Sequence, residues 1–291
     1  MDGDLGDFLR SRRARIQPAD VGLPAFGRRR VPGLRREEVA QLAGVSVDYY
    51  IRLEQGRGSS VSDAVLDSVA RALRLDETER AYLRTVARPR RAAGARAGAG
   101  KAVRPGLQLL LDSIDRAPAF IFGRRMDVLA WNALADALNG FSGLAPADRN
   151  IPRQVFLSAP ERDCYPEWES VAAETVAYLR LDAARFPADA ELASLVGELS
   201  VKSEAFRRLW ADHEVAEKTH GVKRVNHPLV GELVLPYETL TLPADPDHLM
   251  VVYTPTPHSP SADRLSLLAS WTAPTASDPA GSAHAAPRTP D

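Results

Sequence analysis

The sequence predicts an all-α domain of five helices followed by an α+β domain with an antiparallel sheet. Two observations separate the domains: residues 5–87 show helical periodicity with cap residues, and residues 88–101 contain no large apolar side chain. A third observation gives the class of the second domain, because apolar residues after Val222 alternate with a period of two, as in strands. A length of 291 residues is sufficient for two domains.

The first domain is expected to span residues 1–87 and to fold alone. Apolar stripes and caps predict helices over residues 5–15, 35–43, 46–55 and the segments that follow Ser62 and Asp76. Ser62 is a favourable N-cap because its hydroxyl can accept a hydrogen bond from a free helix amide. Asp76 and Glu79 have the spacing of a capping box, in which each side chain bonds the backbone N–H of the other residue.

Residues 34–57 have the spacing of a helix-turn-helix. Ala40 lies where the second helix passes close over the first, and Gly44 lies at the turn, where a positive φ costs glycine little. The residues expected to face the interior are Val39, Ala43, Val45, Tyr50 and Leu53. Two ordinary amphipathic helices joined by a glycine turn are the alternative, but the small residue, the glycine and the apolar positions all fall in register. This pattern favours a DNA-binding module.

In such modules the first residues of the second helix enter the major groove. Arg52 can donate two hydrogen bonds to guanine, Asp48 can accept one from cytosine, and Val47 can contact a thymine methyl group. Tyr49 can stack or bond a phosphate, while Arg35 and Arg36 begin the first helix, where a phosphate is favoured. The residues expected to bind DNA are Arg35, Arg36, Ser46, Val47, Asp48, Tyr49, Arg52 and Arg57.

An arginine run and a glutamate near this module are not counted among the expected DNA contacts. The run Arg28, Arg29 and Arg30 either grips the DNA backbone or consists of solvated loop charges. Glu54 is expected to hold the fold by bonding the backbone or Arg52.

The charge distribution agrees with a nucleic-acid partner for the first half. Residues 1–104 hold 21 basic and 13 acidic residues, whereas residues 105–291 hold 16 basic and 25 acidic residues. A basic half beside an acidic half suggests that only the first meets phosphate, although a solvated face of each sign is the alternative.

The second domain is expected over residues 105–271, after a flexible linker over 88–104 and before a disordered tail over 272–291. A helix over 107–114 is followed by a hairpin signal, in which two apolar strands flank residues 123–127. Asn132 and Ser203 are expected N-caps of later helices. Further apolar stripes predict helices around residues 168–179 and 192–199, and strands follow Val222 as far as Thr254.

Several motifs resemble those of the MmyB-like transcriptional regulators of bacteria, which carry a Cro/CI-type or XRE-type DNA-binding domain. The residues that carry the resemblance are 30–40, 49–56, 209–213 and 227–233, and it covers residues 4–256. It implies that the second domain is PAS-like and binds a ligand. Arg36 departs from the pattern, since modules of this type usually have glutamine there, and contacts made by that amide do not carry over.

A PAS-like sheet covered by helices can enclose an apolar pocket, although the same aromatic residues can simply fill a core. The residues expected to bind the ligand are Trp131, Phe206, Trp210, His213 and Tyr237. Phe206, Leu209, Trp210 and His213 form one helical stripe, which we expect to pack against the strands around residues 233–242. His213 is either a ligand group or a satisfied residue of the core or of a helix end.

Other chemistry is not expected. His213, His220 and His227 recur every seven residues, but no cysteine or close histidine pair supports a metal site. The sequence contains no glycine-rich phosphate loop, and Cys164 has no nearby histidine, so neither a cofactor nor an enzymatic activity is expected.

The sequence therefore predicts a transcription factor that binds double-stranded operator DNA as a homodimer and senses a small apolar or amphipathic ligand. A ligand-free dimerisation or protein-interaction platform is the alternative for the second domain. An enzyme fused to a DNA-binding domain would need a paired acid and base, which the sequence does not offer. A cytoplasmic, nucleoid-associated location is expected, because no apolar run spans a bilayer and the N-terminus lacks a secretion signal.

Overall fold

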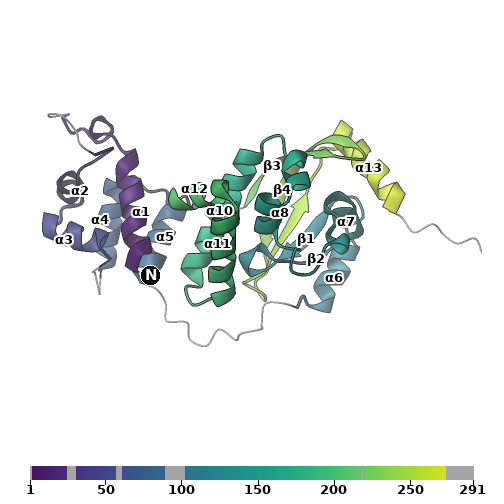
Figure 1. The fold of residues 1–291 in the computed structure, drawn as a ribbon, viewed down its shortest axis with the longest axis horizontal. Helices are drawn as coiled ribbons and strands as arrows, with labels where there is room; N and C mark the ends of the chain where they lie inside the picture. The colour runs from purple at the N-terminus through teal and green to yellow at the C-terminus, as the bar shows by residue number, and fades with distance from the viewer. Residues whose placement is uncertain (1, 25–30, 57–60, 89–101, 218, 273–291) are drawn as a thin grey trace, which may run out of the picture.

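The computed structural model describes residues 2–24, 31–56, 61–88, 102–217 and 219–272. Most of the expected linker and all but the first residue of the expected tail lie outside this part of the chain. Figure 1 shows a helical unit formed by the N-terminal segment beside a unit of helices and strands.

The helical unit contains the five predicted helices. They are α1 (Asp2–Arg15), α2 (Arg36–Ala43), α3 (Val47–Glu54), α4 (Asp63–Ala72) and α5 (Glu77–Ala87), with a short 3₁₀ helix, η1 (Pro18–Val21), after α1. The hydroxyl of Ser62 accepts a hydrogen bond from the N–H of Val65, and Asp76 forms a capping box with Glu79. These caps are confirmed. They explain why α4 and α5 begin where they do, since each satisfies helix amides that have no partner within the helix.

The core of this unit includes the residues that the helix-turn-helix pattern predicts. Tyr50 and Leu53 of α3 are buried with Val39 and Ala43 of α2, while Val45 is half-buried. Their neighbours in the core are mostly large apolar side chains of α1, α4 and α5, among them Phe8, Leu9, Leu66, Val69 and Leu83.

The second unit contains a five-stranded antiparallel sheet with the order β2-β1-β5-β4-β3. Its strands are β1 (Ala119–Phe122), β2 (Val128–Trp131), β3 (His220–His227), β4 (Gly231–Thr241) and β5 (Leu249–Tyr253). The 3₁₀ helix η2 (Arg124–Met126) connects β1 to β2, as the hairpin signal predicted. An all-α domain followed by an α+β domain with an antiparallel sheet is therefore confirmed.

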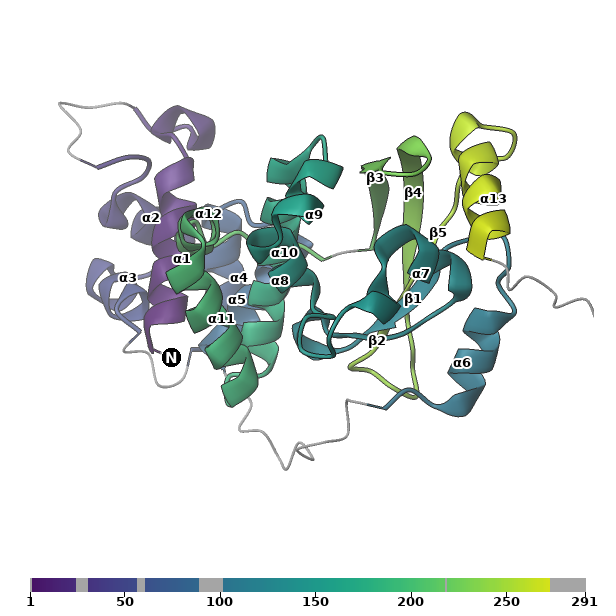
Figure 2. The ribbon, with the colours of Figure 1, turned by 45° about the vertical axis from the view of Figure 1, so that its right-hand side comes forward.

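Helices cover both faces of the sheet (Figure 2). One face packs on α6 (Pro105–Asp112) through residues such as Ile121 and Met250. The other face presents Phe120, Phe122 and Leu235 to α7 (Ala133–Asn139), α8 (Ile151–Leu157), α9 (Ala159–Cys164), α10 (Trp168–Arg185) and α13 (Pro260–Thr272), with the 3₁₀ turn η3 (Phe141–Gly143). The remaining helices, α11 (Ala190–Lys202) and α12 (Glu204–Ala211), pack on α10 and on each other.

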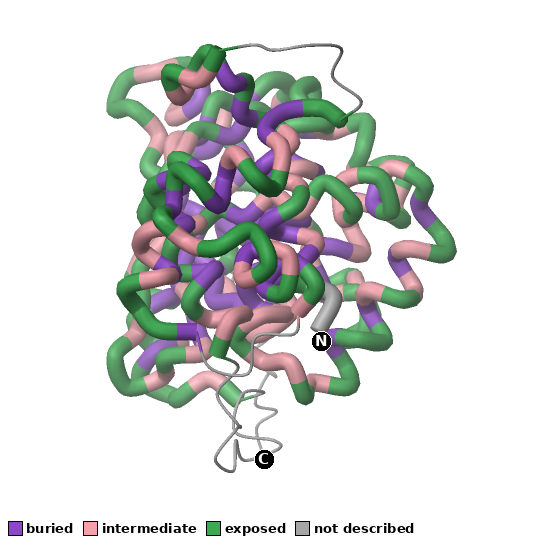
Figure 3. Tube along the Cα trace, turned by 90° about the vertical axis from the view of Figure 1, so that its left-hand side faces the viewer, coloured by how far each residue is buried: buried purple, intermediate pink, exposed green. Residues whose placement is uncertain are grey.

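The two units share apolar contacts. Leu181 of α10 and Val215, after α12, pack into the core of the helical unit. Viewed from the side of the helical unit, the buried segments lie inside and the exposed segments outside (Figure 3). The expectation that residues 1–87 fold alone stays a prediction, since part of the core around them comes from the second unit.

Candidate functional site

Backbone hydrogen bonds and caps fix the turn between α2 and α3. The N–H of Arg35 donates to the Glu38 carboxylate at 2.6 Å, and this contact begins α2. Gly44 ends α2 with a φ of 68°, the left-handed region that glycine adopts without strain. The N–H of Val45 then donates to the carbonyl of Ala40 at 3.0 Å. Helix α3 begins at Ser46, whose Oγ accepts from the N–H of Tyr49 at 3.2 Å.

The N-terminal turn of α3 is open to solvent. Ser46, Val47, Asp48 and Arg52 are exposed, and Tyr49 is half-buried. The Arg52 guanidinium lies 6.0 Å from the centre of the Tyr49 ring, so these two side chains are neighbours on one face. The structure thus brings together five of the eight residues expected to bind DNA.

A buried ion cluster holds α3 against α1 and α2. The carboxylate of Glu54, only 2% exposed, accepts from Nε and Nη2 of Arg13 at 3.1 and 3.0 Å and from Nε of Arg36 at 3.0 Å. Arg13 also donates to the carbonyl of Leu34 at 2.7 Å. Glu54 therefore holds the fold as expected, but its partners are Arg13 and Arg36 rather than Arg52.

The remaining expected DNA contacts are placed less directly. Arg36 is 45% exposed and is already bonded to Glu54, so it faces solvent from a fixed position. Arg35 is half-buried, with its Nη1 3.4 Å from Glu37. Arg57 and the run 28–30 lie outside the described residues.

Gly6 explains how α1 approaches α3 so closely. A Cβ atom at this position would lie 2.2 Å from the carbonyl oxygen of Glu54. No side chain fits between the two backbones, and the sequence pattern had not singled out this glycine.

The expected ligand stripe on α12 does not face the sheet, and this prediction is wrong. Phe206 is fully buried between Phe156 of α8, at 5.1 Å between ring centres, and Trp210, at 5.5 Å. Helix α12 packs on α10 and α11, because α8 and α9 occupy the space beside the sheet. The sequence had not predicted α8 and α9, so the strands around residues 233–242 were the expected surface for this stripe.

Trp210 and His213 instead lie where the two units meet. Arg180 of α10 is 2% exposed and donates to the carbonyl of Trp210 and to Nδ1 of His213, the latter at 3.0 Å. From the helical unit, Nη2 of Arg12 donates to the carbonyl of His213 at 2.8 Å. Burial, followed by the charge of Arg180, lowers the pKa of His213 to about 4, so its ring is neutral at pH 7.

Two ion pairs accompany these hydrogen bonds, the first within the helical unit and the second between the two units. Arg12 lies 2.6 Å from the carboxylate of Glu79, and Arg15 pairs with Glu214 of the second unit. We use the term interdomain contact for Arg12, Glu79, Arg180, His213 and Glu214. Through it, the end of α12 bonds directly to α1 of the helix-turn-helix unit.

A small cavity lies between the sheet and α8, with a volume of about 20 Å³. It is lined mainly by aromatic and aliphatic side chains: Phe120, Phe122, Phe141, Ile151, Val155, Tyr165, Tyr237, Val251 and Tyr253, together with Asn139, Gln154 and Lys223. Tyr237 is the one expected ligand residue among them, and burial raises its pKa to about 12. Trp131 lies outside the lining and contacts Phe141, with 5.5 Å between ring centres.

Lys223 gives this cavity a polar end. Its side chain is largely buried, with Nζ 5.4 Å from the centre of the Tyr165 ring. The sequence analysis missed it, although the alternation of β3 places Lys223 on the same face as Val225 and His227. A lysine on the buried face of a strand was the signal available.

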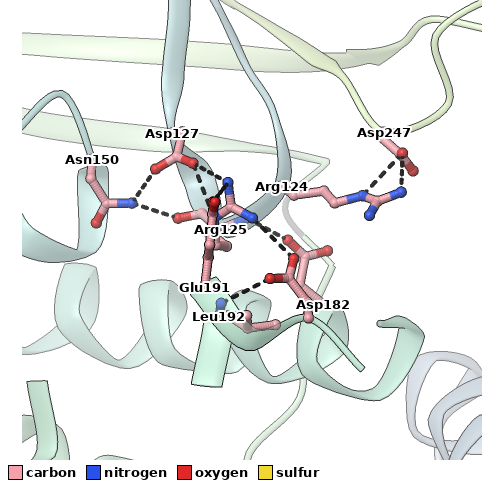
Figure 4. Close-up of polar contacts among 9 residues, drawn as sticks. Arg124, Arg125, Asp127, Asn150, Asp182, Glu191, Leu192 and Asp247 are labelled. Carbon is pink, nitrogen blue, oxygen red and sulfur yellow. Dashed lines mark hydrogen bonds and ion pairs between the residues drawn. The ribbon is translucent and has the colours of Figure 1, made fainter. Parts of the chain in front are cut away.

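A second polar cluster surrounds the β1–β2 connection (Figure 4). Arg125, with a left-handed φ of 61°, pairs with Asp127, Asp189 and Glu191 at 2.9 to 3.0 Å. Its backbone N–H donates to Asp182 at 3.1 Å. Burial raises the pKa of Asp182 to about 6.

Within the described residues, no group of three histidine, cysteine, aspartate or glutamate side chains could hold a metal ion. His213 and His227 are held in separate places, the first in the interdomain contact and the second in β3.

Comparison with known families gives two matches. A model described as the MmyB-like transcription regulator ligand binding domain matches residues 103–268, and a model described as a helix-turn-helix domain matches residues 4–83. The resemblance thus extends beyond residue 256, where the motifs in the sequence had ended. A comparison with curated proteins finds no match. Among the described residues, no helix has the length and apolar character needed to cross a bilayer.

Proposed function

The chain belongs to the MmyB-like transcription regulators, with a DNA-binding domain and a ligand-binding domain, and we propose that α3 reads the operator sequence directly. In this proposal Asp48 and Arg52 contact base edges, Val47 contacts a thymine methyl group, and Arg35, Arg36 and Arg57 contact phosphate. Two copies bind together, one on each half-site.

The exposed N-terminal turn of α3 is the observation that carries this proposal. Val47 is 42% exposed although it is apolar, and it lies beside the exposed side chains of Asp48 and Arg52. Helix α3 also lies at the end of the molecule remote from the sheet (Figures 1 and 2), so the second domain leaves this face accessible.

The ligand in this proposal is a small, largely apolar molecule that enters between the sheet and α8. Small-molecule sites are mostly apolar with a few polar anchors, and the aromatic lining with Lys223 has this composition. A volume of about 20 Å³ holds no more than a water molecule, so a ligand must displace Tyr165 or α8 from the sheet. Because α12 packs on α10 and α11 and also bonds α1, such a movement would reach the helix-turn-helix domain.

The experiment for the DNA proposal is selection of an operator in vitro, followed by affinity measurements on every single-base variant. We expect Asp48→Ala and Arg52→Ala each to relax preference at one base pair, at a cost of about 1–3 kcal/mol. Arg71→Ala, which removes an exposed arginine of α4, is the matched control. Wild-type base ranking in both α3 variants would contradict the proposal.

The small cavity also favours a second candidate for the C-terminal domain, a dimerisation platform without a ligand. Val222 and Leu240 are 58% and 49% exposed on β3 and β4, and a second copy could cover them. Native mass spectrometry of the purified protein separates the candidates. A dimer without bound small molecule, together with no thermal shift from a panel of amphipathic compounds, would favour the platform.

A further inference from the structure

An open cleft of about 840 Å³ lies between the two domains, on the side of α10 that faces α5. One wall is the end of α5, with Arg84, Thr85 and Arg88. The rest comes from the ligand-binding domain: Arg124, Tyr178, Asp182, Ala184, Arg185, Phe186, Thr241, Pro246, Asp247 and Leu249. This cleft is far larger than the cavity beneath the sheet and shares no lining residue with it.

The lining is rich in arginine. Four arginines and two aspartates line the cleft, and each of the four arginines also pairs with a carboxylate, Arg88 with Asp63 at 2.9 Å. Arg84 pairs with Asp67 and Arg185 with Glu217, at 2.7 and 3.2 Å, and all four side chains are about half exposed. Exposed ion pairs stabilise a fold little, so these two guanidinium groups can turn to a bound anion at small cost.

Arg124 is held in place more firmly. Its guanidinium lies 3.8 Å from the centre of the Phe186 ring, and it donates to the Asp247 carboxylate at 2.5 and 3.0 Å (Figure 4). A stacked and bonded arginine loses little further freedom when it binds a ligand, which is the property of a preorganised site.

Asp182 of α10 also lines the cleft. It is 4% exposed and accepts the backbone N–H of Arg125, while Arg124, Arg185 and Asp247 are the charged groups around it. In its protonated form this carboxyl can donate a hydrogen bond to an anionic oxygen. The apolar side chains of Phe186, Pro246 and Leu249 leave room for the body of an organic molecule.

We propose that this cleft binds a small organic anion with at least two negative charges, a phosphate ester or a polycarboxylate. The planar guanidinium group matches the oxygens of both groups in pairs. Since Arg84 and Arg88 come from the DNA-binding domain and Arg124 and Arg185 from the other, the bound anion joins α5 to α10. The site is separate from the apolar cavity and does not depend on a ligand there.

Joining the domains has a consequence for DNA. If a ligand favours one arrangement of the two domains, it changes the protein's affinity for DNA. DNA then changes the protein's affinity for that ligand by the same factor. The anion therefore acts on the orientation of the helix-turn-helix domain and not on α3 itself.

The test uses the full chain and isothermal titration calorimetry at constant ionic strength, with pyrophosphate and citrate as probes. We expect saturable binding of at least one probe with one anion per chain. Arg84→Gln and Arg185→Gln, one from each domain, should each weaken it about tenfold or more. Arg207→Gln removes an exposed arginine of α12 outside the cleft and should leave affinity unchanged. Thermal melting checks that each variant is folded.

Three outcomes would overturn the proposal. The first is no saturable heat with either probe, and the second is an equal loss in the Arg207→Gln control, which would indicate diffuse charge attraction. The third is loss of binding in Arg52→Ala with normal binding in both cleft variants, which would place the anion on the DNA-reading surface. None of these outcomes bears on operator recognition, which the base-preference measurements test separately.

Discussion

Helices α3 and α12 are closely alike as local structures and differ in what surrounds them. Each is eight residues long and begins after a serine whose hydroxyl accepts an N–H at 3.2 Å, from Tyr49 in α3 and from Phe206 in α12. The exposed first turn of α3 lies at the end of the molecule (Figure 1), whereas α12 packs its apolar face on α10 and α11 and is followed by His213, which bonds the helical unit. A cap and an apolar stripe define a helix, and the packing of distant elements decides whether its free face can bind a partner.

The buried ion cluster beneath α3 should give the largest effect. Glu54→Ala leaves the guanidinium of Arg13, 8% exposed, without its carboxylate. Removing one partner of a buried pair costs about 3–5 kcal/mol, and we expect this loss in the free energy of unfolding by urea. Glu37→Ala breaks only an exposed contact with Arg35 and is the control. A stability equal to the wild type would show that the cluster does not support α3.

The corresponding polar support of α12 is Arg180. Arg180→Met keeps much of the side-chain volume but removes the donor to the carbonyl of Trp210 and to His213. An unsatisfied buried polar group costs about 1–3 kcal/mol, and we expect a loss of this size in urea unfolding. Val201→Met, at a position 83% exposed on α11, is the control. Loss of DNA affinity without loss of stability would assign Arg180 to signal transmission instead.

Asp182 contrasts with Glu54, because no side-chain cation bonds its carboxylate among the contacts of the described residues. Its pKa is raised to about 6, so the folded state binds its proton more tightly than the unfolded state does. Its contribution to stability is present below about pH 4 and is lost as the pH rises through about 6. Asp182→Asn should therefore raise the free energy of unfolding at pH 7.5 by about 1–2 kcal/mol.

The same substitution should have almost no effect at pH 4, where the wild-type carboxyl is protonated. Thermal melts of both proteins from pH 4 to 8 measure this difference. Curves that stay parallel across the range would contradict a raised pKa.

The smallest effects are expected from the N-cap serines, and they distinguish α3 from α12 most directly. Ser46→Ala and Ser203→Ala each remove an N-cap, and each should lower stability by about 1 kcal/mol in urea unfolding. Only Ser46→Ala should also weaken operator binding, because the amides of α3 lie at the proposed DNA surface. Equal loss of operator affinity in both variants would mean that α12 affects DNA binding through the interdomain contact.

The sequence was sufficient for the helix-turn-helix because its signals are local. Gly44, Ser46 and the capping box of Asp76 act within four residues, and each is found where the pattern placed it. The partners of Glu54 were not predictable in this way, since Arg13 lies 41 residues away on α1.

The second domain shows more clearly what the sequence patterns could not predict. Its strands and the caps Asn132 and Ser203 follow from local patterns. Helices α8 and α9 are short, and each carries proline in its first turn, so they resemble loops in the sequence. Without them, the stripe of Phe206 and Trp210 was assigned to the sheet rather than to α8, α10 and α11. Contacts between elements that are distant in sequence leave no periodic signal.

The close approach at Gly6 bears on how the operator preference of such a regulator can be rewritten. The contact uses the main chain at the end of α3 and leaves the side chains of Val47, Asp48 and Arg52 free. A variant in which only these three side chains are replaced by those of another helix-turn-helix protein keeps the contacts of α3 with α1 and α2. Replacing the whole helix would remove Glu54 and leave the buried guanidinium of Arg13 without its carboxylate partner. For protein engineering, the exposed side chains of α3 can therefore be exchanged, whereas its backbone contact with Gly6 and the side chain of Glu54 must be kept.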